Sequence, residues 1–115
     1  MKRDLDLIRD IMLRLEEAPR EHIELIFEDT SPEVLDYHLE LLMNSGMIRE
    51  TSKSQTQDGV EILAPFITMQ GHDFLDDVRE DSVWVRAKEK AASAAGTASI
   101  QVVKHFATEI MKGLS

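Results

Sequence analysis

The sequence predicts a mainly helical α+β fold with one small β hairpin, followed by further helices toward the C-terminus. Three observations indicate this class. Apolar residues recur at helical spacing, a helix-start signal stands at Ser31-Pro32, and residues 47–67 contain two β-prone stretches around a polar, turn-rich segment. The 115 residues, 43% of them hydrophobic, are typical of one globular domain. We expect a core of residues 1–80 and a C-terminal helical extension, residues 81–115, that packs on the core to give one structural domain.

The N-terminal stretch predicts a helix from about Arg3 to Glu17, which Pro19 ends. Its apolar residues recur at steps of three and four and form one stripe: Leu5, Ile8, Ile11, Met12 and Leu15. Residues 21–27 are ambiguous, because their apolar residues fit both the alternation of a strand and the spacing of a short helix. We favour a strand.

A second helix is predicted over residues 31–45, where Ser31 provides an N-cap and Pro32 the first helical position. A capping box that begins at Thr30 is the competing register. The core stripe of this helix is Leu35, Leu39 and Leu42, and Gly46 stops it. Residues 47–67 then predict a wing: a short strand at residues 47–49, a loose tip around residues 54–58, and a second strand within residues 60–67.

Thr68 can cap a third helix, in which Gly71 allows a close approach of backbones. The buried face of that helix is Phe74, Leu75 and Val78. Asp81-Ser82 either caps a new helix or bends the third one. The small residues of the stretch 91–98 indicate a linker or a loosely wound segment, and the last helix begins near Ser99.

Several motifs carry a resemblance to known proteins. The pattern His38-Leu39-x-x-Leu42-x-x-x-Gly46-Met47-Ile48 is similar to the junction of recognition helix and wing in winged-helix proteins. A wider set resembles a small bacterial and phage-associated family that is catalogued only as a domain of unknown function. This set comprises Met1-Lys2-Arg3-Asp4-x-Asp6-Leu7-Ile8-Arg9, Tyr37-His38-Leu39, Ile67-Thr68-x-x-Gly71-His72-Asp73-Phe74-Leu75-Asp76 and Asp81-x-Val83-Trp84. The resemblance implies a winged-helix core and a phage or prophage setting, and it brings no activity and no site residues.

DNA binding is the obvious function of a winged helix, with the helix 31–45 in the major groove and the wing 47–67 on the backbone. The net charge of -9 argues against this function, because phosphates must be met by Lys and Arg. The helix surface outside the core stripe offers acidic groups, and the wing tip adds one cation among polar residues. The candidate interaction surface is therefore Glu33, Asp36, Tyr37, Glu40, Lys53, Gln55 and Gln57. We interpret the chain as a non-enzymatic module for a protein partner, and a DNA-binding transcriptional regulator is the alternative.

The C-terminal third differs in charge from the rest. Residues 1–81 contain 8 Lys or Arg against 20 Asp or Glu, whereas residues 82–115 contain 5 against 2. This third either folds back on the acidic body or reaches another molecule. Its last helix carries a stripe at coiled-coil spacing, which either completes the core or forms a homodimer seam: Ile100, Val103, Ala107, Ile110 and Leu114.

Catalysis and metal binding are not expected. The strongest candidate group is His72-Asp73 beside Asp76 and Asp77, but no second group of this kind completes a site. We therefore expect His72 or Asp73 to tie the helix start to the wing by hydrogen bonds. His38 is interpreted as a partly buried hydrogen-bonding residue. The chain has 0 Cys, no signal peptide and no long apolar run. We therefore predict a cytoplasmic protein with no cofactor, no membrane association and no small-molecule substrate.

Overall fold

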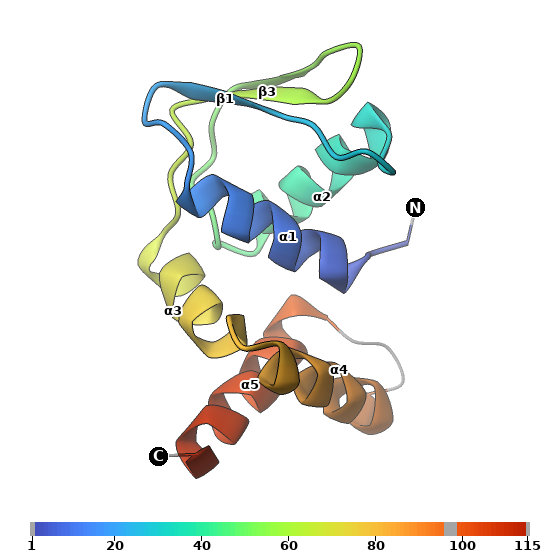
Figure 1. The fold of residues 1–115 in the computed structure, drawn as a ribbon, viewed down its shortest axis with the longest axis vertical. Coiled ribbons are helices and arrows are strands. Elements are labelled where there is room, and N and C mark those ends of the chain that lie inside the picture. The colour runs from blue at the N-terminus through green and yellow to red at the C-terminus, as the bar shows by residue number, and fades with distance from the viewer. Residues whose placement is uncertain (1, 96–98, 115) are drawn as a thin grey trace. The chain divides into compact units, whose positions relative to one another are not determined.

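The computed structural model describes residues 2–95 and 99–114 and shows helices combined with three short strands (Figure 1). The predicted α+β class is confirmed. Along the chain the elements are α1 (Leu5–Glu16), β1 (His22–Leu25), α2 (Pro32–Asn44), β2 (Lys53–Gln55), β3 (Val60–Leu63), α3 (Met69–Val78), α4 (Asp81–Ala95) and α5 (Ile100–Leu114).

The chain divides into two compact units, residues 1–71 and residues 72–115. The division falls within α3, so the first turn of this helix belongs to the first unit and the rest to the second. The packing of the extension 81–115 on a core of residues 1–80 stays a prediction.

Helix α1 begins where the sequence provides a cap. The carboxylate of Asp4 accepts hydrogen bonds from the backbone N–H groups of Asp6 and Leu7, at 3.0 and 3.2 Å. These bonds satisfy two of the N–H groups that the first turn leaves without a helical partner. Four residues of the predicted stripe are buried, whereas Leu5 is only partly buried and Leu7 is buried in addition. The buried residues of the helix are Leu7, Ile8, Ile11, Met12 and Leu15.

The sheet has the order β1-β3-β2 with both pairs antiparallel, so β3 is the central strand. Its Val60 and Ile62 are buried, and Val60 lies opposite the buried Leu25 of β1. Full burial of such aliphatic side chains contributes about 1.5 to 3 kcal/mol each. The ambiguity over residues 21–27 is thus resolved in favour of a strand, at His22–Leu25.

The hairpin departs from the predicted wing in its first arm, whereas β3 lies within the predicted second strand, residues 60–67. Residues 47–49 form no regular strand, but Ile48 makes an isolated antiparallel bridge with Ile67, and the N–H of Arg49 donates to the carbonyl of Phe66 at 2.9 Å. The N–H groups of Met47 and Ile48 also bond to the carbonyl of Leu42 at the end of α2. The regular first arm is β2, which overlaps the predicted loose tip at residues 54 and 55. Its pairing with β3 uses backbone groups, which do not require apolar side chains at the edge of a sheet.

Helix α2 begins as predicted, with Ser31 as N-cap and Pro32 at the first position. The hydroxyl of Ser31 accepts from the N–H of Val34 at 3.3 Å, and the competing register at Thr30 is not used. The helix ends before Gly46, whose φ of +77° is in the left-handed region that glycine adopts without strain.

His38 of α2 has no exposed surface, and both of its ring nitrogens are bonded. Nε2 accepts from the backbone N–H of Asp4 at 2.8 Å, so Nδ1, which lies 2.7 Å from the carbonyl of Val34, carries the proton and donates. This neutral tautomer ties the start of α1 to the first turn of α2. His38 is therefore a hydrogen-bonding residue as predicted, although it is fully rather than partly buried.

Helix α3 starts at the predicted cap, since the hydroxyl of Thr68 accepts from the N–H of Gly71 at 3.1 Å. The same hydroxyl lies 2.5 Å from the carbonyl of Gly46, to which it donates. A Cβ on Gly71 would lie 2.1 Å from the carbonyl oxygen of Met47, which is far inside van der Waals contact. Gly71 therefore permits the close backbone approach that we predicted for it.

The second unit contains one clear departure from the sequence prediction. Helix α4 begins at Asp81 as a separate helix and continues to Ala95, so most of the predicted linker 91–98 is helical. Alanine has the highest intrinsic helix propensity, and Ala87 and Ala91 are buried where α4 and α5 pack together. Residues 96–98 lie outside the described part of the chain. Helix α5 follows Ser99, whose hydroxyl accepts from the N–H of Val102 at 3.2 Å.

The close approach at Gly71 gives a test of the packing in the first unit. We expect Gly71→Ala to lower the free energy of unfolding by about 2 kcal/mol, because the added methyl group forces the backbone at residue 47 away. Gly113→Ala is the matched control, since its Cβ meets no atom within 4 Å. Urea denaturation followed by circular dichroism measures both variants. Equal stabilities of the two variants would contradict the close approach.

The bonds of His38 give a second test. His38→Ala removes a buried side chain and leaves the N–H of Asp4 without its acceptor, so we expect a loss of about 2 to 4 kcal/mol in the free energy of unfolding. The exposed His72 provides the control, and His72→Ala should stay within about 0.5 kcal/mol of the parent. A thermal melt of each variant measures the difference. A His38→Ala variant as stable as the control would show that these two bonds contribute little.

Candidate functional site

The structure brings together four of the seven residues of the candidate interaction surface. Asp36 and Glu40 lie one turn apart on α2, and Lys53 and Gln55 lie on the same face of β2. We call these four residues the α2–β2 charge cluster. Glu33 and Gln57 are exposed and lie outside it, and Tyr37 contacts the ring of His38 edge-on, with centroids 5.3 Å apart.

Lys53 is the central group of the cluster. Its Nζ lies 2.5 Å from Oδ1 of Asp36 and 3.5 Å from Oε2 of Glu40. Gln55 donates from Nε2 to the other carboxylate oxygen of Asp36 at 3.1 Å. The side chains of Lys53 and Asp36 are 17% and 27% exposed, so this ion pair is shielded from solvent more than an ordinary surface pair.

The pair shifts both pKa values in the direction that favours charge. Partial burial alone would raise the pKa of Asp36, but the hydrogen bonds from Lys53 and Gln55 and the charge of Lys53 outweigh burial and lower it. Burial alone would lower the pKa of Lys53, and the carboxylates of Asp36 and Glu40 outweigh burial and raise it. Both groups are therefore charged across the neutral range.

Lys53 is the one cation of the predicted wing tip, and its positive charge is already paired with the carboxylates of the cluster. A lysine whose ammonium group already bonds two carboxylates must break those contacts before it can bind an external anion. With Asp36 and Glu40 both contributing, the cluster retains one net negative charge. This face is therefore neutral to acidic, and its surface chemistry is that of hydrogen-bonding carboxylate and amide groups.

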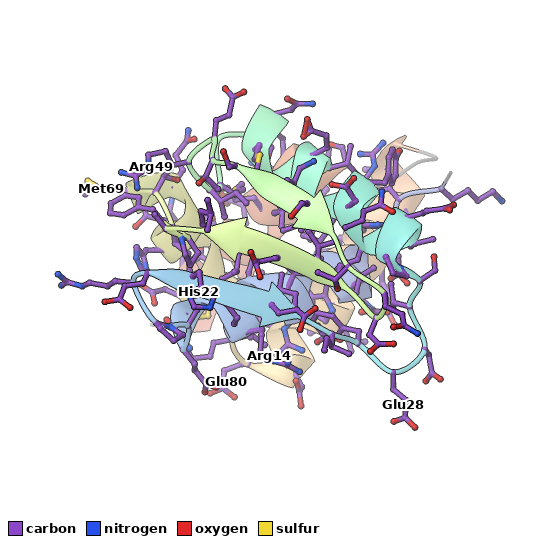
Figure 2. The ribbon with its side chains drawn as sticks, turned by 90° about the horizontal axis from the view of Figure 1, so that it is seen from above. Arg14, His22, Glu28, Arg49, Met69 and Glu80 are labelled. Atoms are coloured by element: carbon purple, nitrogen blue, oxygen red, sulfur yellow. The ribbon has the colours of Figure 1, made fainter. Side chains whose placement is uncertain are left out.

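A second feature lies at the base of the hairpin, where sequence reasoning expected strand up to residue 67. Strand β3 ends at Leu63 because Ala64 adopts a φ of +47° and Pro65 follows it. Beyond this bend, the guanidinium of Arg49 lies 4.6 Å from the centroid of the Phe66 ring. Figure 2 shows Arg49 and Met69 at the same corner of the first unit.

This corner exposes large apolar side chains. Phe66 is 52% exposed and Met69 83%. Leu63, at the end of β3, is 49% exposed. Sequence reasoning missed this feature, because it expected a strand within residues 60–67 and placed Met69 in the helix that Thr68 caps. The signal that could have found it is the Ala-Pro step, which interrupts a strand in the middle of a sheet.

The predicted seam of α5 is covered within the chain. Ile100, Val103, Ala107 and Ile110 are all buried, and the side chain of Leu114 lies outside the described residues. Helix α5 packs against α4. The burial of these four residues supports the interpretation that the stripe completes a core rather than a homodimer seam.

The acidic residues of α3 do not gather into a site. His72 and Asp73 are exposed, and Thr68 rather than either of them caps the helix. Asp77 instead accepts a hydrogen bond from the hydroxyl of Thr108 at 2.6 Å. Within residues 2–95 and 99–114, no group of three or more His, Asp or Glu side chains is arranged to hold a metal ion. In the same residues, no helix is long and apolar enough to cross a membrane.

These features define a small, acidic α+β protein with a charge cluster on its second helix and a sheet of order β1-β3-β2. Residues 2–98 match the family described as "Hypothetical protein (DUF2513)", and the chain belongs to this family. It is also similar to an "Uncharacterized protein" of Haemophilus influenzae, with 33% identity over 114 residues that cover 96% of each chain. No solved structure matches the chain.

The ion pair predicts a pH dependence of stability. The lowered pKa of Asp36 means that its contribution is present at neutral pH and is lost as the pH falls through that lowered value. Asp36→Asn should therefore reduce the free energy of unfolding by about 1 kcal/mol at neutral pH, and by much less in acid. Asp58→Asn, at the exposed hairpin turn, is the control. Urea denaturation over a pH series tests this, and a constant difference between Asp36→Asn and the parent at every pH would contradict it.

Proposed function

We propose that this chain is a non-enzymatic winged-helix module of the cytoplasm that binds a protein partner through the face of α2 and β2. The order α1, β1, α2 and hairpin, together with the sheet order β1-β3-β2, supports a winged-helix core. Helix α2 stands directly before the hairpin, in the position of a recognition helix. Between β1 and α2 there is only a turn, in which the N–H of Thr30 donates to the carbonyl of Phe27.

The observation that carries the proposal is the neutralisation of Lys53. A face that binds DNA needs cations free to replace the counterions of phosphates, and their release supplies most of the non-specific affinity. Here the wing cation is bonded to Asp36 and Glu40, which themselves occupy the helix surface next to it. Carboxylates at this position repel a phosphate backbone and favour cationic or hydrogen-bonding groups on a protein.

The partner would belong to a phage or to its host, as the resemblance to phage-associated proteins implies. An acidic face of this kind is complementary to a basic surface, and proteins that themselves bind nucleic acid present such surfaces. The module would then act by occupying its partner rather than by changing it chemically.

A DNA-binding transcriptional regulator is the second candidate, and the position of α2 relative to the hairpin favours it. Arg49 at the hairpin base could also reach a phosphate. Its guanidinium lies over Phe66, where the exposed ring leaves it accessible. The acidic groups of α2 weigh against this candidate.

A mobility-shift titration against mixed-sequence duplex DNA at low salt separates the two candidates. We expect no retardation at micromolar protein, because the face of α2 lacks the cations that non-specific binding requires. The double variant Asp36→Asn, Glu40→Gln releases Lys53 and should bind DNA more tightly than the parent. Retardation by the parent protein that weakens steeply with added salt would favour the regulator instead.

Site-specific crosslinking tests the protein partner directly. A photoreactive amino acid at Gln57, which is exposed beside the hairpin turn, should yield a discrete protein adduct in cells, and Glu40→Lys should abolish it. The same amino acid at Asp73 is the control, because that residue is exposed but lies in the other unit. Equal adducts from both positions, or adducts with nucleic acid alone, would contradict the proposed face.

Self-association through α5 would require a second copy to reach a stripe that the chain already covers. Light scattering on the intact chain and on a chain truncated before Ser99 tests this form of the proposal. A monomeric intact protein, or an oligomer that survives the truncation, excludes α5 as a dimer seam.

A further inference from the structure

A groove of about 470 Å³ runs between α4 and α5, entirely within the second unit. The two helices pack along each other in the lower part of Figure 1. A second hollow of about 460 Å³ adjoins the groove, shares Lys90 and Phe106 with it, and continues to Ser93 and Ala94. The side chains that shape the groove are Arg86 and Lys90 of α4 and His105, Phe106, Glu109 and Ile110 of α5.

The charge of this groove is opposite to that of the α2–β2 charge cluster. Arg86 and Lys90 are exposed, lie one turn apart on α4, and form no ion pair with any residue that the structure describes. Glu109 is the carboxylate of the groove, and it lies 3.8 Å from the ammonium group of Lys112. Glu89 is the carboxylate of the adjoining hollow. Among the described residues, Arg86 and Lys90 therefore have no ion-pair partner beside the apolar floor.

The floor consists of Phe106, which is partly exposed, and Ile110, which is 6% exposed. From Arg86 to Ala94 the groove follows α4 for about 12 Å, which is roughly two turns of a helix. A channel of this length with an aromatic and an aliphatic side chain in its floor matches the helix-in-groove mode, in which an amphipathic helix inserts its apolar face. The two cations at its edge select a helix whose flanking residues are carboxylates.

We propose that the α4–α5 groove binds an acidic amphipathic helix of a partner protein. The apolar face of that helix packs on Phe106 and Ile110, and its carboxylates pair with Arg86 and Lys90. This inference goes beyond the proposed function, because it concerns the other unit and a partner of opposite charge. The proposal for the groove is independent of whether the face of α2 and β2 binds a protein.

Nuclear magnetic resonance of the full chain tests the groove with a defined probe. A synthetic peptide with Leu and Glu at helical spacing is titrated into the isotope-labelled protein. The amide resonances that shift should lie in residues 86–94 and 105–113. The double variant Arg86→Gln, Lys90→Gln should raise the Kd by roughly fivefold to tenfold, as two partly exposed ion pairs contribute.

A matched control keeps the overall charge constant. Lys88→Gln, Lys104→Gln removes the same number of positive charges, one from each of the two helices, and neither residue lines the groove or the adjoining hollow. This control should bind the peptide with nearly the Kd of the parent. Circular dichroism melts show whether each variant is folded, and only folded variants are compared.

Four results would overturn the proposal. Equal weakening by both double variants would show a general charge attraction. Equal binding of a peptide with Lys in place of Glu would show that the cations of the groove do not select the ligand. An absence of shifts at millimolar peptide would show that no such helix binds. Shifts of the same resonances with protein concentration alone would show that a second copy of the chain occupies the groove.

Discussion

The burial of one side of α2 determines what the other side can do. Leu35, His38, Leu39 and Leu42 are buried with at most a trace of exposed surface, which fixes the rotation of the helix about its axis. With this rotation, Asp36 and Glu40 are directed at β2, and the neighbouring lysine becomes their partner. The bonds of His38 fix the same rotation from inside, because its ring must reach the backbone of Asp4. The packing of the core therefore determines that the acidic side chains of α2 lie on the face toward β2.

Local rules predicted the boundaries of the helices well and the pairing of the strands poorly. Ser31, Gly46 and Thr68 act within a turn of their own positions, so the sequence alone is enough to recognise them. The strand β2 has no apolar alternation, and its register follows from backbone bonds to β3 that composition does not reveal. Similarly, the alanines before residue 96 were assigned to a linker because small residues give no periodic signal, although alanine favours a helix.

The candidate surfaces likewise depend partly on local sequence and partly on contacts between residues that are far apart in the sequence. Composition predicted an acidic face on α2, but it could not show that Lys53 would be bound there, since 17 positions separate it from Asp36 and only the sheet brings them together. The charge asymmetry drew attention to the C-terminal third of the chain. The groove itself could not be predicted, because it is formed by side chains of two helices, and the contact between these helices depends on tertiary packing. The chain thus presents two surfaces of opposite charge, one on each unit.

The exposed corner of the first unit has a chemical consequence. In a chain with 0 Cys, thioether groups are the sulfur chemistry that remains, and Met69 is the most exposed methionine that the structure describes. Met12 and Met47 are buried, which protects their sulfur atoms from oxidants in solution. Peroxide would therefore oxidise Met69 first and convert an apolar side chain beside Phe66 into a polar sulfoxide. The apolar character of this corner depends on the redox conditions around the protein.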